Sequence, residues 1–428
     1  MKQHQKMLLG IVIGTVAGIA ANTLAGGQPW LEWVVTNITN LAGTLFLRLL
    51  LMLVVPLLFS ALVMGICELD LKQLGRLGLR TMGYTVVISS IAVLIGLLLV
   101  NTLEPGKGLS DEARALATKG AAVQAAPTPS NTSVPSLIAA MVPSNPVKAA
   151  ADSDMIALIV FSLIFGVGLT LTHTPGARQL RDTIQGLYEV MMKLIDGVLK
   201  LAPYGVAALL FSMTARLGFG ILMQVAAYVG VVLLALGLHM FGVYSLSVRF
   251  LGGRNPLTFF RDCRLAIVTA FSTASSSATL PTALKVAEEN LKLPRNVARF
   301  VLTAGSAMNQ NGTALFEGVT VLFLAQVFGV ELSLPDQAVV MFICVLAGIG
   351  TAGVPAGSIP VIAMILGLFK IPPEGLALVL GVDRFLDMCR TTLNVTGDLA
   401  AAVYVARGEP TTEPDSPSAR LPSESPAR

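Results

Sequence analysis

Long apolar runs constrain this chain more than any other feature. Six predominantly apolar segments reach roughly the 20 residues that an α-helix needs to cross a bilayer. They cover about 7–26, 40–67, 77–102, 155–173, 183–213 and 219–247. The whole chain is 54% hydrophobic and 13% charged, whereas a soluble protein carries about a quarter charged residues. The sequence therefore predicts an all-α polytopic membrane protein.

The basic residues predict how the chain lies in the membrane. They occupy alternate connections between the apolar runs, at Lys2, Lys6, Lys72, Arg76, Arg80, Arg178, Arg181, Arg249, Arg254, Arg261, Arg264, Lys285, Lys292, Arg295, Arg299 and Arg407. Apart from a polar loop at 103–150, the opposite connections hold little more than Arg216 and Lys370. The positive-inside rule places both termini in the cytoplasm. Because the basic residues lie at segment ends, the net charge of +4 gives no indication of nucleic-acid binding.

Two later segments begin and end on the same side of the predicted membrane. Residues 257–292 return to the basic side, and residues 335–372 return to the opposite side. Their tips, "FSTASSSATLP" and "GIGTAGVPAGSIP", contain small polar residues and a proline. Flexible loops fit poorly, because apolar helices flank both tips. We expect two re-entrant helical hairpins beside eight transmembrane helices, the inverted-repeat pattern that indicates a transporter site near the bilayer midplane.

A polar stripe follows the last predicted helix, "GVDRFLDMCRTTLNVTGDLAAAVYVAR" at 381–407. At about 100° per residue, one face roughly 120° wide holds Asp383, Arg384, Asp387, Arg390, Thr391, Asn394 and Asp398. Charged groups on a membrane helix must face protein, water or ligand. One interpretation is a structural ladder of salt bridges, with Asp383 paired to Arg390 or Arg384 paired to Asp387.

The other interpretation is a binding site for an acidic amino acid. Arg390 offers a planar guanidinium for a carboxylate, and Asp387 offers an anion for an ammonium group. Asn394 and Asp398 offer hard oxygens for a small cation. A second polar stretch, "NQNGTALFEG" at 309–318, interrupts apolar sequence, and such groups are costly in hydrocarbon unless they have a function.

Four motifs together resemble the dicarboxylate/amino acid:cation symporter family, the glutamate transporter-like proteins. They are the serine-rich "TASSSATLP", "NQNGTA" against the family's NMDGT, "GTAGVP", and "LDMCRTTLNVTGD". The resemblance covers nearly the whole membrane region. It implies a homotrimer in which each protomer has a fixed scaffold and a mobile transport domain. That domain moves like an elevator, with the two hairpins as gates.

The resemblance also implies a division of the chain. Residues 1–250 are mainly scaffold and trimerisation helices, although the third helix at about 77–102 joins the transport domain. Residues 251–407 form the core of that domain, including the hairpins at 257–292 and 335–372. The polar stretch 103–150 is an extracytoplasmic loop, and the Pro/Ser/Glu-rich end at 408–428 is a disordered cytoplasmic tail.

Site residues follow from the same resemblance. The substrate side-chain carboxylate is read by Arg390 and its amino group by Asp387. Ser276, Thr313, Thr391, Asn394 and the outer-hairpin backbone at Val354 complete the pocket. One sodium site is implied at Gly305, Asn309, Asn394 and Asp398. A second uses backbone carbonyls at Ala307, Gly348, Ile349 and Thr351. Co-transported sodium ions and/or protons are expected, and no other cofactor.

The chain departs from the family at a third sodium site. Asn311 stands where the motif has Asp, and Gln310 replaces Met. The third-helix positions that would join that Asp are Thr85, Ile88 and Ser89. Because Ile88 supplies no side-chain oxygen, we expect this third site to be weakened or absent.

Two further positions, Glu317 and Arg384, each have more than one interpretation. Glu317 matches the proton carrier of proton-coupled members, and burial favours the protonated form of a carboxyl. It is equally interpretable as a structural carboxyl bonded near Thr313. Ala274 stands where some members have an arginine. Arg384, one turn before Met388, is a candidate to supply that charge, paired with Asp387 or Glu317.

We therefore expect a symporter of the bacterial inner membrane that imports L-glutamate or L-aspartate, not an enzyme. Its expected partners are this substrate, membrane lipid and further copies of the chain. The alternative is a C4-dicarboxylate symporter, although a substrate without an amine would leave Asp387 unpaired at a cost of several kcal/mol. A distant alternative is a membrane-embedded hydrolase using serines 275–277, but the histidines lie far away in sequence, at His4, His173 and His239.

Overall fold

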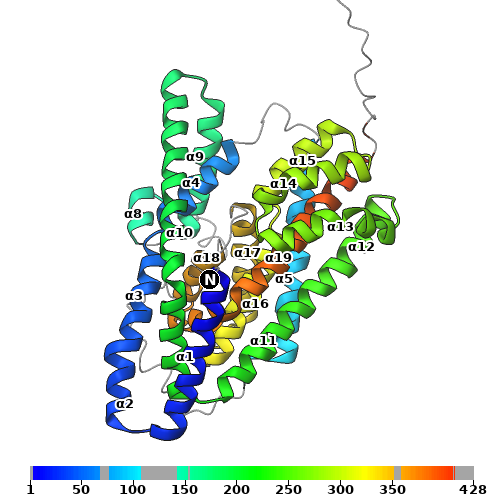
Figure 1. The fold of residues 1–428 in the computed structure, drawn as a ribbon. Helices are drawn as coiled ribbons and strands as arrows, with labels where there is room; N and C mark the ends of the chain where they lie inside the picture. Colours follow the sequence, from blue (N-terminus) through cyan, green and yellow to red (C-terminus); the bar gives the residue numbers. More distant parts are fainter. Residues whose placement is uncertain are drawn as a thin grey trace, which may run out of the picture.

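The computed structural model describes residues 3–67, 77–107, 142–152, 155–350, 358–407 and 409, and every regular element within them is helical. By their packing the helices fall into two groups. In Figure 1 the first group lies mainly on the left and the second mainly on the right, and they meet where α1 and α10 contact α19. The first contains α1 (Gln3–Ala25), α2 (Pro29–Val34), the π-helix η1 (Val35–Thr39), α3 (Asn40–Leu51), α4 (Val54–Cys67), α8 (Pro146–Ala151), α9 (Met155–Leu171) and α10 (Pro175–Leu217).

The second group surrounds the central helix α16 (Asn311–Phe328), where every residue except Gln326 is buried. It also contains α5 (Leu79–Leu103), α11 (Gly220–Gly237), η3 (Leu238–Val243), α12 (Tyr244–Leu246), η4 (Ser247–Leu251), α13 (Pro256–Thr273), α14 (Ser276–Lys285), η5 (Val286–Asn290), α15 (Arg295–Met308), α17 (Leu334–Gly350), α18 (Ser358–Leu368), η6 (Pro373–Gly375) and α19 (Leu376–Ala406). Helices α5, α11, α17, α18 and α19 all pack against α16.

Glycines set the close packing of α1 against α10. Gly10, Gly14 and Gly18 repeat every fourth residue on α1. A Cβ atom on Gly10 or Gly14 would collide with the backbone carbonyl of Pro203 or Ala207 on α10. Small residues at this spacing let membrane helices approach closely, where dispersion contacts rather than hydrophobic burial drive association.

The predicted span 40–67 is wrong as a single helix. It consists of α3 and α4, separated at Met52 and Leu53. Pro56 explains the break, because proline has no N–H to bond to the carbonyl four residues earlier, at Met52, and its ring crowds that carbonyl. At its other end α3 continues back through η1 to α2, which the sequence analysis did not anticipate.

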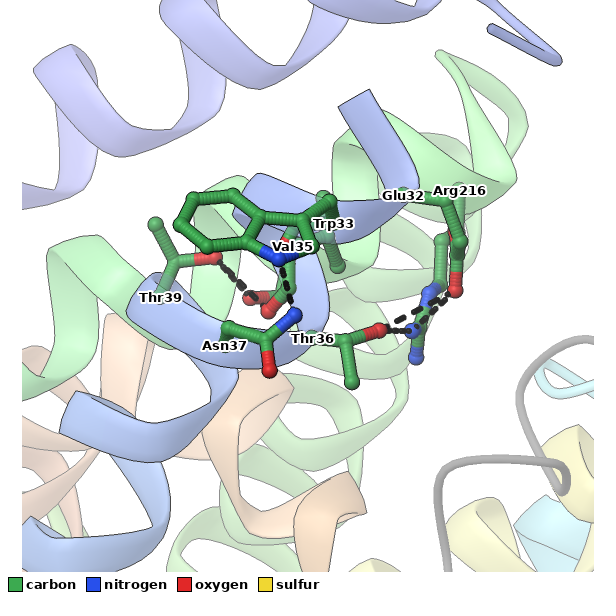
Figure 2. Close-up of polar contacts among 8 residues, drawn as sticks. Glu32, Trp33, Val35, Thr36, Asn37, Thr39 and Arg216 are labelled. Carbon is green, nitrogen blue, oxygen red and sulfur yellow. Dashed lines mark hydrogen bonds and ion pairs between the residues drawn. The ribbon is translucent and has the colours of Figure 1, made fainter. Parts of the chain in front are cut away.

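Polar contacts fasten η1 to the end of α10 (Figure 2). The hydroxyls of Thr39 and Ser212 lie 2.7 Å apart. Arg216 donates to the Glu32 carboxylate at 2.6 Å and to the Thr36 hydroxyl at 3.1 Å. Side chains from α2, η1 and α10 thus hold this corner of the first group together.

Helix α10 is longer than the predicted 183–213 and is bent. It runs from Pro175 to Leu217, and its two halves meet at 52° between Ile195 and Lys200. Pro203 lies inside the helix. It cannot bond to the carbonyl of Leu199, which accounts for a bend at this position.

The first predicted hairpin segment is a helix–break–helix unit. Helix α13 ends at Thr273, Ala274 has a left-handed φ of 49°, and α14 begins at Ser276. The Ser275 hydroxyl caps α14 by accepting from the Ala278 N–H at 3.2 Å, and α13 packs against α14.

The second predicted hairpin segment contains α17 and α18, whereas its tip at 351–357 lies outside the described residues. The expected loop at 103–150 and tail at 408–428 also lie largely outside them. That both segments re-enter the membrane remains a prediction.

Within the described residues, length and apolar composition identify three helical stretches able to cross a membrane: Leu79–Leu103, Gly220–Leu251 and Arg295–Phe328. The bent helix α10 is a fourth if its halves form one span. The expected total of eight spans remains a prediction.

The packing of α1 on α10 predicts that Gly14→Leu destabilises the protein. Overpacking against the Ala207 backbone is expected to lower the free energy of unfolding by about 1–3 kcal/mol. Thermal unfolding of the purified protein in detergent would measure the change. Gly230→Leu is the matched control, because a Cβ on Gly230 meets no atom within 4 Å. Equal melting temperatures for the two variants would contradict the predicted clash.

Candidate functional site

A helix break lies at the centre of the second group. Asn309 and Gln310 separate α15 from α16 and have non-helical backbone angles. The Gln310 N–H donates to the Gly348 carbonyl at the end of α17, at 3.2 Å. The Gly312 N–H donates to the Asn394 side chain on α19, at 2.7 Å. Two neighbouring helices thus satisfy backbone groups that a break would leave exposed.

The Asn394 side chain connects the break to α19. Its amide nitrogen donates to the Gln310 side chain at 2.5 Å and to the Thr313 hydroxyl at 3.1 Å. Its oxygen accepts the Gly312 N–H. The structure therefore brings together Thr313 and Asn394, two of the residues predicted to bind substrate. In the sequence, Gln310 is only a departure from a motif, and no pattern there predicts this contact.

Asn309 and Asp398 meet beside Gly305. The Asn309 amide donates to Asp398 Oδ1 at 2.9 Å, and a Cβ on Gly305 would lie 2.5 Å from the same oxygen. The Asn309 side-chain oxygen is buried and has no hydrogen-bond partner among the described residues. A buried carboxylate beside an unused acceptor oxygen is suited to a hard cation. Three of the four residues predicted for the first sodium site, Gly305, Asn309 and Asp398, therefore lie together. The side chain of the fourth, Asn394, contacts Gln310, Gly312 and Thr313 instead.

The predicted second sodium site lies at adjoining helix ends. Ala307 belongs to the last turn of α15 and Gly348 to the last turn of α17, and these two helices contact each other. Ile349 packs against Ala304 and Met308. Thr351 lies outside the described residues. Among the residues described, no cluster of three or more His, Cys, Asp or Glu side chains could hold a metal ion.

The charged stripe of α19 forms a chain of ion pairs. Arg390 Nη1 donates to Asp383 at 2.8 Å, and Arg390 Nη2 lies 3.0 Å from Asp387 Oδ1. Arg384 Nη1 lies 3.7 Å from Asp387 Oδ2. Both pairs of the structural interpretation are therefore present, together with the Arg390–Asp387 pair. Arg384 contacts Asp387 as predicted by one of its two alternatives, and no ion pair to Glu317 is found within the described residues.

Burial distinguishes the two arginines. The Arg390 side chain is 2% exposed, and its guanidinium carbon lies 4.3 Å from the centre of the Phe316 ring. The Arg384 side chain is 44% exposed. The site thus contains a buried cation and a buried anion in contact, a combination that can bind a ligand with both charges. In the sequence, Phe316 is an ordinary apolar residue, so its contact with the Arg390 guanidinium was not predicted.

Glu317 lies fully buried on α16, one turn after Thr313. Neither carboxyl oxygen has a hydrogen-bond partner within the described residues, and the Thr313 hydroxyl instead contacts Asn394. The structural alternative of a carboxyl bonded to Thr313 is therefore not found.

The structure gives fewer contacts for the remaining residues that were predicted to bind substrate. Ser276 begins α14, which packs against α19, and its buried hydroxyl has no partner among the described residues. Thr391 is buried on α19, and Val354 lies outside the described residues. His239 packs edge-on against Tyr244 and makes no hydrogen bond to Ser276.

A neutral network lies at the position of the third sodium site, which the sequence predicts to be weakened or absent. Ser89 on α5 donates to the Asn311 oxygen at 2.5 Å, and the Asn311 amide donates to the Tyr244 hydroxyl at 2.9 Å. Tyr244 donates in turn to the Leu393 carbonyl at 3.2 Å. Thr85 and Ile88 are buried on the same helix as Ser89. Tyr244 was not among the predicted site residues, and its only indication in the sequence is a phenol group within an apolar run.

The contacts of Asn394 predict that Asn394→Leu is strongly destabilising. The buried Gly312 N–H and Gln310 oxygen would lose their partner, at about 1–3 kcal/mol for each unsatisfied group. Thr396→Val is the control, because Thr396 is equally buried on α19 and its hydroxyl, within the described residues, bonds only to Thr392 of its own helix. Thermal unfolding in detergent would compare them, and a larger loss for Thr396→Val would contradict the assigned role.

The comparisons with known proteins cover nearly the whole chain. Residues 4–408 match the family described as the sodium:dicarboxylate symporter family. The chain is 31% identical to the proton/sodium-glutamate symport protein of Bacillus subtilis, over 93% of this chain and 92% of that protein. It is 33% identical to the proton/glutamate-aspartate symporter of Escherichia coli, over 94% and 91%. It is 31% identical to the C4-dicarboxylate transport protein of Rhodospirillum rubrum, over 95% and 89%.

Proposed function

Because this chain belongs to the sodium:dicarboxylate symporter family, we propose that it is a secondary active symporter for L-glutamate and L-aspartate in the bacterial cytoplasmic membrane. The family is one of transporters and not of enzymes. One observation carries the substrate proposal: Arg390 and Asp387 lie 3.0 Å apart and almost fully buried, beside the helix break. A buried cation and anion in one place suit a substrate that carries both charges.

Each charged end of the substrate has its own binding residue. Arg390 binds the side-chain carboxylate through its planar guanidinium, which has five N–H donors and shares them between acceptors. Asp387 binds the ammonium group. Thr313, Thr391, Asn394, Ser276 and the backbone at Val354 hold the remaining carboxylate. The buried Ser276 hydroxyl, which has no hydrogen-bond partner in the part of the chain that the structure describes, supports this assignment.

The cations bind beside the substrate. The first sodium ion uses Gly305, Asn309, Asn394 and Asp398, supported by the unused oxygen of Asn309. The second uses the carbonyls of Ala307, Gly348, Ile349 and Thr351. The third family site is absent, because the Asn311 amide already bonds to Ser89 and Tyr244. Glu317 carries a proton, since a charged carboxyl is costly where it is buried with no hydrogen-bond partner among the described residues.

The charge of the substrate sets the minimum number of cations. An acidic amino acid enters as a monoanion, which a negative-inside potential opposes by about 2.3 kcal/mol per 100 mV. Uptake driven by that potential therefore requires at least two co-transported positive charges. Two sodium ions, or one sodium ion and one proton, satisfy this requirement.

We also propose an elevator-type homotrimer with eight spans and both termini in the cytoplasm. The first helix group is the scaffold. The second group is the mobile transport domain, and its hairpins at 257–292 and 335–372 are the gates. It includes α5, as the division from sequence has it, and also α11, which that division left with the scaffold at 1–250, because α11 packs against α16 and α19. The mutual packing of the second group around α16 supports movement as one body (Figure 1).

Glu317 decides which cation drives uptake. Uptake of labelled L-aspartate and L-glutamate would be measured in proteoliposomes under separately imposed sodium and pH gradients. We expect an inward proton gradient to stimulate uptake, and Glu317→Gln to abolish this stimulation, because an amide cannot carry a proton. The exposed Glu331 provides the control Glu331→Gln. Uptake driven by sodium alone and indifferent to pH would make Glu317 structural.

Arg390 is predicted to set substrate preference. Arg390→Cys removes the partner of the side-chain carboxylate, so the affinity for aspartate should fall by about 100-fold, the equivalent of roughly 3 kcal/mol. Competition by serine and alanine should increase. Competition against labelled aspartate uptake would measure both effects, with Arg216→Cys as the control. Retained aspartate selectivity in Arg390→Cys would contradict the role of Arg390.

A further inference from the structure

Asp387 has a cationic partner at each oxygen. Arg390 approaches Oδ1 at 3.0 Å from one side, and Arg384 approaches Oδ2 at 3.7 Å from the other. The three residues are spaced by three positions on α19, so they lie on neighbouring turns of one face. Asp387 therefore remains paired without any contribution from a ligand.

The two pairs differ in environment. Arg390 is 2% exposed and also bonds to Asp383, whereas Arg384 is 44% exposed. A buried ion pair is costly to break, because one charge is left uncompensated. The Arg384–Asp387 pair is longer, at 3.7 Å, and solvent reaches the Arg384 side, so this pair is weaker than the buried one although Asp387 itself is only 6% exposed. Arg384 is thus the partner that a ligand can replace at Asp387.

This arrangement removes the objection to substrates without an amine. On sequence alone, a C4-dicarboxylate is disfavoured because it would leave Asp387 as an unpaired buried anion. In the structure, Arg384 already supplies a cation to Asp387 Oδ2. A dicarboxylate can therefore use Arg390 and the polar groups near Asn394 while Arg384 stays in place.

We propose that Arg384 is a specificity-determining residue that stands in for the substrate ammonium group at Asp387, so that one site accepts both acidic amino acids and C4-dicarboxylates. With aspartate, the ammonium group replaces the weakly held Arg384 guanidinium. With succinate, Arg384 remains on Asp387 and keeps it neutralised. This inference rests on the proposed function, and it assigns the second substrate class to the same pocket.

The test uses the purified full-length chain. Binding of L-aspartate and of succinate is measured by thermal stabilisation in detergent with sodium present, and uptake is measured in proteoliposomes. The variants are Arg384→Ala, Arg384→Gln and Arg384→Lys. Arg216→Ala is the control, because Arg216 pairs with Glu32 in the other helix group. The readout is the ratio of succinate affinity to aspartate affinity, which a general loss of stability does not shift.

We expect the wild-type protein to bind both ligands. Arg384→Ala and Arg384→Gln should lower the affinity ratio by about tenfold or more, since Asp387 loses the substitute cation only when succinate is bound. Arg384→Lys should keep the ratio within about threefold, because its ammonium group also pairs with a carboxylate. Arg216→Ala should leave the ratio unchanged.

The outcomes separate this inference from the proposed function. Wild-type protein that binds and imports aspartate but does not bind succinate overturns the inference alone. A ratio unaffected by Arg384→Ala and Arg384→Gln overturns it as well. If Arg384→Ala does not fold, the ratio of succinate affinity to aspartate affinity is measured with Arg384→Gln instead. Wild-type protein that neither binds nor imports aspartate or glutamate overturns the proposed function instead.

Discussion

The site depends on a helix that stops and restarts inside an apolar core. Peptide groups exposed by such a break cannot form hydrogen bonds with water in an apolar core, so neighbouring helices must provide their partners. Gly348 at the end of α17 and Asn394 on α19 do so for Gln310 and Gly312. The same contacts bring Asn309 to Asp398 and Thr313 to Asn394. The break thus assembles the polar groups of the candidate cation and substrate sites in one place.

Charge balance is the second requirement on this core. Arg390 and Asp387 are almost fully buried, and each would be costly without the other. Asp383 and Arg384 complete a chain of two anions and two cations along one face of α19. In the proposed function, binding a substrate with both charges is an exchange of partners within this balanced set. Glu317 lies outside this set, which is why a bound proton is the proposed way to neutralise it.

The Asn311 network shows how a polar pocket can be filled without an ion. An amide supplies both a donor and an acceptor, so Asn311 joins Ser89 to Tyr244 where a carboxylate would need a cation. Gly397 leaves room for the Tyr244 hydroxyl, because a Cβ atom on Gly397 would collide with that hydroxyl. In the proposed function, the hydrogen bonds of Asn311 take the place of a cation at this position.

The sequence by itself determined the helical class, the helix–break–helix unit at 257–292 and the polar face of α19. Each follows from local hydropathy, from helical periodicity or from residues that break helices. The bend of α10 and the interruption at Met52 were also encoded locally, by Pro203 and Pro56, but a hydropathy reading of spans does not register a proline within an apolar run.

Only the tertiary structure decided which polar groups meet. The partners Gln310–Asn394 and Asn311–Tyr244 are separated by 84 and 67 positions in the chain. No periodicity relates residues on different helices, because their contact depends on how those helices pack. The Arg384–Asp387 pair is local, because the two residues lie three positions apart on α19. Packing decided only that the other candidate partner, Glu317, is enclosed within the core by the helices around α16.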